Sequence, residues 1–185
     1  MASSTATPAT TSIWKIDPAH SAAEFKVKHM MISNVKGKFI GISGTLTYDP
    51  GSITAANVEA EVPVATIRTG DEQRDGHLKS ADFFDAEKFP TLAFKSTAVR
   101  AIGPDENEVT GDLTLHGVTK SVTFAVEGPT APSKDPWGNE RIGLSATTKI
   151  NRKDFGLTWN TALETGGVLV GEDVAITLDI EFIKG

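Results

Sequence analysis

The chain has 185 residues, a formal net charge of −6 and no cysteine. This length predicts one domain whose core needs neither disulfide nor metal, and the missing thiol excludes disulfides and cysteine-based catalysis or metal centres. The eighteen basic residues are scattered, which argues against a nucleic-acid partner and against permanent attachment to an anionic membrane. No window has the apolar length of a membrane span, so stable membrane insertion is not expected.

The first twelve residues, MASSTATPATTS, predict a disordered N-terminal tail. They are small and polar, and they lack the basic and apolar regions of a secretory signal. We therefore expect residues 1–12 to be a tail and residues 13–185 to form one domain. We also expect a cytoplasmic protein.

Alternation of apolar and polar residues, typical of a strand with one buried face, begins at Ile13. Asp17-Pro18 interrupts it, and a second strand follows around Phe25. From Val35 to Tyr48 the alternation changes phase, which we interpret as a β-bulge near Gly41 within one long strand. Two separate strands with a turn near Gly41 are the alternative.

After a strand over Val58–Val64, the segment from Ile67 to Phe94 is the one convincing helical stretch. Thr69 and Glu72 fit a capping box, and a second turn is expected over Ser80–Lys88 before Pro90 ends it. We therefore predict a short helical insert around residues 69–89.

Alternation resumes after the insert and continues to the C-terminal end. The total is about eight strands joined mostly by short turns, the spacing of a barrel or sandwich. Because every strand has one apolar face, we predict an all-β, antiparallel eight-stranded barrel that encloses a side-chain core or one small ligand. The strands after the insert are expected around Leu92–Ala98, Val109–Leu115, Val122–Val126, Ile142–Ile150 and Val174–Phe182.

Motifs for catalysis are weak. The sequence has no nucleophile elbow, zinc-protease motif, P-loop or EF-hand loop. His20 and His29 would face opposite sides of a continuous strand and cannot share a metal by simple alternation. We predict no catalytic residue and no metal site, with the histidines at the surface or hydrogen-bonded.

Polar residues near the expected barrel rim are candidates for contact with the headgroup of a ligand. Arg74 and Asp75 form either a headgroup contact, an ion pair bracing the mouth, or a solvated helix surface. Asn151 and Arg152 end a strand, where they contact a ligand or brace a local turn. His77 is a further candidate.

Five segments, taken in chain order, resemble the YceI-like family over about Ile13–Phe182. They are WKIDPAHSAAEFKVKHMMISNVKGKFIGISGTLTYDP, TGDEQRDGHLKSADFFDAEKFPTLAF, GDLTLHGVTKSVTF, INRKDFG and GEDVAITLDIE. The resemblance implies a lipocalin-like barrel with an elongated isoprenoid or other long-chain amphiphile in an apolar tunnel. Its members are commonly bacterial, often exported, and linked to isoprenoid quinone handling, stress or lipid binding.

The resemblance implies a non-catalytic protein for binding, storage or transport of a polyprenyl or isoprenoid quinone, with no required cofactor. A fatty acid or fatty amide ligand is the first alternative. The others are an enzyme acting on an isoprenoid or lipid through His77 or Asp75, and a plain β-domain with a filled core.

Aromatic and methionine side chains concentrate at chain reversals, which suits a flexible apolar guest, although core packing is the default for any single one. Phe83 and Phe84 at a cavity mouth would expose an apolar patch, which makes a homodimer plausible. The predicted apolar ligand contacts are Phe25, Met30, Met31, Phe39, Leu78, Phe83, Phe84, Phe94, Leu115, Phe124 and Trp159.

Overall fold

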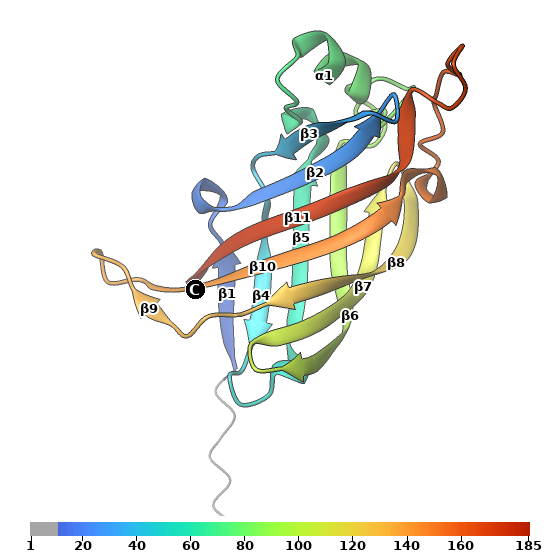
Figure 1. Cartoon of the computed structure of the whole chain (residues 1–185). Helices are drawn as coiled ribbons and strands as arrows, with labels where there is room; N and C mark the ends of the chain where they lie inside the picture. The colour runs from blue at the N-terminus through green and yellow to red at the C-terminus, as the bar shows by residue number, and fades with distance from the viewer. Residues whose placement is uncertain (1–10) are drawn as a thin grey trace, which may run out of the picture.

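The computed structural model describes residues 11–185 (Figure 1). The predicted tail lies outside the described residues up to residue 10, and the first strand already begins at Ser12. The strands are β1 (Ser12–Ile16), β2 (Ala22–His29), β3 (Ser33–Phe39), β4 (Ser43–Tyr48), β5 (Asn57–Pro63), β6 (Thr91–Gly103), β7 (Glu106–Leu115), β8 (Val118–Glu127), β9 (Ser133–Lys134), β10 (Glu140–Asn151) and β11 (Val170–Lys184).

Helical structure is short. α1 (Glu72–Lys79) is the one α-helix among the described residues, and the 3-10 turns are η1 (Pro18–His20), η2 (Ile53–Ala55), η3 (Val64–Thr66) and η4 (Arg152–Phe155).

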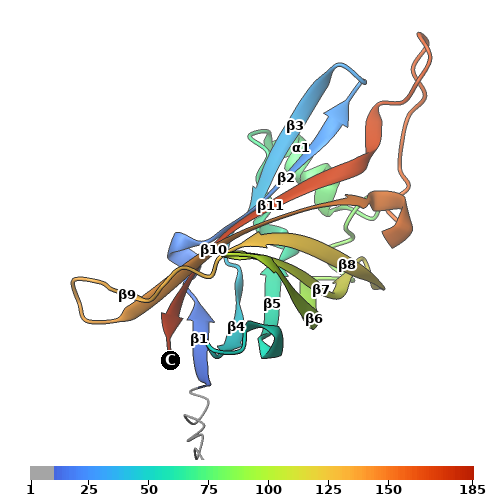
Figure 2. The ribbon, with the colours of Figure 1, turned by 60° about the horizontal axis from the view of Figure 1, so that its bottom comes forward.

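Eight of the strands close into a ring. The ring runs β1–β4–β5–β6–β7–β8–β10–β11, and it closes because β11 pairs with β1 as well as with β10. Every pairing is antiparallel, and the strands surround one interior in both views (Figure 1, Figure 2). The predicted antiparallel eight-stranded barrel is therefore confirmed.

Three strands are additional to the ring. β9 pairs with β10, and β2 and β3 arise because two strand positions of the barrel are interrupted. β2 continues the position of β1 beyond η1 and pairs with β11, while β3 continues the position of β4 and pairs with β2. The phase change predicted between Val35 and Tyr48 is thus a break between β3 and β4, not a bulge. Gly41 stands in that break with φ +76°, a conformation that favours glycine.

The break leaves the barrel incompletely paired between β3 and β5. Outside the β2–β3 hairpin, β3 has one bridge, from Lys38 to Arg68. The segment that joins β5 to β6 carries α1 and lies at this end of the barrel (Figure 1). We call this end, where α1 and the β2–β3 tip lie, the insert end.

The start of the insert differs from the predicted capping box. Asp71 is the N-cap of α1, and its carboxylate accepts from the Arg74 backbone N–H at 3.0 Å. Thr69 lies before the cap and is held by the Asp75 carboxylate instead. The expected second helical turn, Ser80–Lys88, consists of turns without α-helix, because Asp85 takes a left-handed φ of 50° within it.

The interior is densely filled only in part. Along β11 the inward-facing Ile180 and Phe182 are buried, whereas Val174, Ile176 and Leu178 face the same interior and keep accessible surface. The interior is therefore packed around Phe182 and keeps free space along the inward face of β11 from Val174 to Leu178.

Candidate functional site: an apolar cavity inside the barrel

A cavity of about 280 Å³ runs inside the barrel. Its walls include β11 from Val174 to Ile180, a stretch of roughly 20 Å in an extended strand. Glu24, Asn107 and Arg152 are the lining residues with polar side chains, and Glu24 is on an exposed strand position. The volume is close to the lower end of ligand pockets, roughly 300 Å³, and the lining suits an apolar chain.

The structure brings most of the predicted apolar residues to this cavity. Phe25 and Phe39 pack with ring centroids 5.7 Å apart, and Phe84 meets Phe39 edge-on at 5.8 Å. The predicted site residues that line the cavity are Phe25, Phe39, Leu78, Phe83, Phe84, Phe94, Leu115, Phe124 and Arg152. Contact of these residues with a ligand stays a prediction.

Six predicted site residues do not line the cavity. Met30 and Met31 form the exposed tip of the β2–β3 hairpin, because the turn carries them beyond the last paired residues, His29 and Ser33. The prediction that methionines line the barrel mouth therefore does not fit their position. The remaining four are Arg74, His77, Asn151 and Trp159.

Arg152 is a buried cation whose bonds all go to backbone. Its guanidinium donates to the carbonyls of Leu157, Trp159, Gly171 and Val170 at 2.6, 2.9, 2.7 and 3.3 Å. Burial lowers the pKa of this guanidinium below its ordinary value, although Glu172 opposes the effect. These contacts brace the turn, and contact of Arg152 with a ligand stays a prediction.

Asn151 also braces the turn. Its side-chain oxygen accepts from the Lys153 backbone N–H at 2.9 Å, which caps η4, and its amide donates to Glu172.

Arg74 and Asp75 do not pair with each other but meet at Thr69. Arg74 donates from Nε to the Thr69 hydroxyl and from Nη2 to the Thr69 carbonyl, each at 2.8 Å. Asp75, which is buried, accepts from the Thr69 N–H and hydroxyl. The pair thus fixes the segment that enters α1, so bracing of the insert accounts for both side chains.

His77 lies just outside the cavity wall in an aromatic cluster. Its ring meets Phe83 and Trp159 edge-on, with centroids 5.1 and 4.8 Å apart. Its Nε2 is 2.8 Å from the Asp82 carboxylate. Since Phe83 lines the cavity and His77 does not, this cluster closes the wall between α1 and the chain after η4.

Phe83 is 6% exposed and Phe84 is half-buried. The burial of Phe83 removes much of the apolar rim on which the homodimer was argued, so a homodimer stays a prediction.

Sequence reasoning missed Asn107. It shares the alternation of Val109 and Leu113 on β7, so the same parity rule predicts that it points inward. Its amide donates to the Gly128 carbonyl at 2.8 Å in the interior. The signal was present, but a polar residue in an inward position was not recognised as part of the wall.

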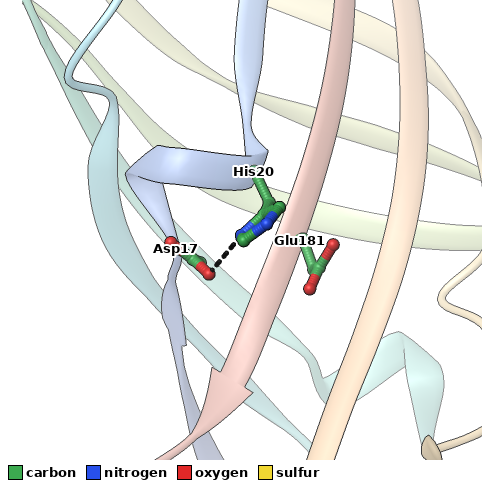
Figure 3. A group of neighbouring side chains, drawn as sticks. All are labelled: Asp17, His20 and Glu181. Carbon is green, nitrogen blue, oxygen red and sulfur yellow. Dashed lines mark hydrogen bonds and ion pairs between the residues drawn. The ribbon is translucent and has the colours of Figure 1, made fainter. Parts of the chain in front are cut away.

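One group of side chains has the spacing of metal ligands among the described residues. It consists of Asp17, His20 and Glu181 at the turn between β1 and β2 and on β11 (Figure 3). Arg141 donates from Nη1 to both carboxylates at 2.7 Å. Arg141 and His20 together lower the pKa of Asp17 to about 2. The cluster thus already holds its cation, the guanidinium, and joins β1 to β10 and β11.

Fold and site together define a class: antiparallel β-barrels that enclose an apolar cavity beneath a short helical insert. The YceI-like domain matches residues 14–182, and the chain belongs to that family. Among curated relatives, the UPF0312 protein SA2479 of Staphylococcus aureus (strain N315) is 40% identical over 167 residues, covering 90% of this chain and 94% of that protein.

Solved structures support the same assignment. The YCEI protein of Campylobacter jejuni is 32% identical with a TM-score of 0.71, covering 85% of this chain and 90% of that one. A polyisoprenoid-binding domain from Saccharophagus degradans, implicated in plant cell wall breakdown, matches with a TM-score of 0.66 over 93% and 98% of the two chains. At 15% identity this second likeness shows the fold alone.

In the part of the chain that the structure describes, no helix is both long and apolar enough to cross a membrane.

Proposed function

We propose that the protein binds the hydrocarbon chain of an isoprenoid, a polyprenyl compound or isoprenoid quinone, inside the barrel for storage or transport without turnover. The observation that carries the proposal is the hollow, apolar stretch of wall along β11 and its neighbours. Each buried CH₂ contributes about 0.8 kcal/mol, so an extended chain gains affinity in proportion to its buried length.

The relative named as polyisoprenoid-binding supports this choice of ligand class. Among the described residues that line the cavity, Glu24 is the one acid–base side chain and it is exposed, which supports binding without turnover. Asp75 is occupied by Thr69, and His77 is outside the lining.

A fatty acid is the second candidate, and Arg152 favours it. This guanidinium lines the cavity and has only backbone carbonyls as hydrogen-bond partners among the described residues. A carboxylate headgroup near it would add a charge of opposite sign in a poorly solvated place.

Extraction of the purified protein with organic solvent, followed by mass spectrometry, tests the proposal. An isoprenoid mass supports it, and a fatty acid or fatty amide mass selects the second candidate. Protein that yields no apolar molecule and binds neither added quinone nor fatty acid would refute both.

A further inference from the structure

The tip of the β2–β3 hairpin is an exposed apolar turn. Met30, Met31 and Ile32 are 41, 59 and 80% exposed. Met30 and Met31 both take left-handed φ values, 51° and 63°, where glycine or asparagine is the usual residue. The turn geometry therefore does not select these side chains. Met31 lies beside Gly167, yet most of its surface and most of Ile32 remain exposed.

The outer face of the same hairpin is basic although the chain is acidic overall. Lys26, Lys28, Lys36 and Lys38 occupy exposed positions on it, with Glu24 the one acid. Lys26 and Lys36 stand directly opposite each other, a pairing of like charges that destabilises a sheet. None of the four lysines has an ion pair among the described residues, so folding does not account for this charge either.

The tip lies at the insert end, beside the wall of the cavity. The Met30 N–H donates to the Leu169 carbonyl at 2.8 Å, and His29 pairs with Val170, which lines the cavity. The adjoining loop, residues 161–169, carries a single acid, Glu164. Any surface that binds the tip would therefore lie against the insert end of the barrel, where β2 and β11 border the cavity.

We propose that the β2–β3 hairpin docks reversibly on an anionic bilayer, with Met31 and Ile32 entering the headgroup region and the four lysines facing the lipid phosphates. Apolar side chains with adjacent cations are the chemistry that binds such an interface. The hairpin supplies both on a chain whose remaining surface carries the excess negative charge, so docking is local and oriented. Its purpose, loading or delivery of the ligand, rests on the proposed function, but the docking itself does not.

The absence of cysteine from the chain permits a direct test with one fluorescent label. Full-length protein with Ile32→Cys carries an environment-sensitive fluorophore and is titrated with vesicles of phosphatidylglycerol or of phosphatidylcholine. Ile102→Cys, an exposed position on β6, is the matched control. We expect a blue shift and brighter emission only for the label at position 32, only with phosphatidylglycerol, and weaker at high salt because the lysine contribution is screened.

The contribution of charge is tested by the double variant Lys26→Gln with Lys36→Gln, which should weaken vesicle binding about tenfold or more. The control variant Lys134→Gln on β9 should not weaken it.

Equal responses at positions 32 and 102, or none with phosphatidylglycerol at low salt, would overturn the proposal. Self-association abolished by Ile32→Ser would also overturn it, because a second copy would then be the partner. Vesicle binding by protein from which no lipid can be extracted would refute the proposed function and leave the docking intact.

Discussion

The charged guanidinium of Arg152 is buried inside one end of the barrel and does not face solvent. Four backbone carbonyls from the chain after η4 and the start of β11 converge on its guanidinium. The residue thereby holds a loop that would otherwise leave buried acceptors without donors.

We predict that Arg152→Met lowers the free energy of unfolding by at least ~3 kcal/mol, because each buried carbonyl left without a donor costs about 1–3 kcal/mol. Urea denaturation followed by circular dichroism measures it. Lys153→Gln, which removes an exposed ion pair with Glu172, is the control and should cost at most about 1 kcal/mol. Equal effects of the two changes would show that the carbonyl contacts do not stabilise the turn.

Asp17 makes stability depend on pH. Its pKa is held at about 2, below the ordinary 3.8, by Arg141 first and His20 second. Because the folded-state pKa is depressed, the carboxylate stabilises the fold above its ordinary pKa, and this contribution is lost as pH falls toward 2.

Asp17→Asn should therefore be less stable than the wild type at neutral pH, and the difference should shrink as pH is lowered from about 4 to about 2. Thermal unfolding across this range measures the difference, with Asp112→Asn on the exposed face of β7 as the control. A difference that stays constant with pH would contradict the role of the cluster.

At the scale of elements, the insert combines one regular helix with turns that place phenylalanines. Gly76 lies within α1, and a Cβ there would meet no atom within 4 Å. Gly117, in the β7–β8 turn, has φ +72° and would place a Cβ 2.5 Å from the Phe89 ring.

Gly76→Ala should raise the free energy of unfolding by about 1 kcal/mol, because alanine restricts the unfolded chain and favours helix. Gly117→Ala should lower it by more than ~1 kcal/mol through the backbone conformation and the ring contact. Chemical denaturation of the two variants measures both values, and a stabilising Gly117→Ala would show that the turn geometry is wrong.

Phe84 and Phe89 offer a matched pair within the insert. Both are half-buried, but Phe84 lines the cavity, whereas Phe89 packs on His116 outside it. Phe84→Ser should therefore reduce retention of a bound lipid more than Phe89→Ser does, at a comparable loss of stability. Lipid content per folded protein, measured after gel filtration, is the readout; equal retention would mean that Phe84 serves only the fold.

The alternation of side chains was enough to predict the barrel and most of the apolar wall, because inward positions on strands follow a strict period of two. It failed where position depends on contacts distant in sequence. The break at Gly41 follows from β3 pairing with β2 and β4 with β1. Likewise, the bonds of Arg152 to Gly171 and Trp159 could not be read from its neighbours in sequence.

The methionines show the limit of composition as a guide. Flexible, polarisable methionine side chains suit a cavity mouth. Met30 and Met31 instead form an exposed turn in which both have a left-handed backbone conformation. Asn107 shows the reverse, because its parity pointed inward while its polarity suggested otherwise.

The function proposed for the whole molecule requires that the cavity inside the barrel holds an apolar chain. Leu178 faces the cavity from β11, and Thr177 is its exposed neighbour on the outer face of the same strand. Leu178→Trp should fill the hollow and exclude the ligand with little loss of fold, while Thr177→Trp should leave the ligand in place.

The most direct measurement is the amount of isoprenoid extracted per mole of folded protein from the wild type and these two variants, determined by mass spectrometry. We expect near-equal amounts for the wild type and Thr177→Trp, and a loss of most of the ligand for folded Leu178→Trp. Isoprenoid retained in full by Leu178→Trp, or absent from the wild type even after incubation with polyprenyl compounds and quinones, would contradict the proposed function.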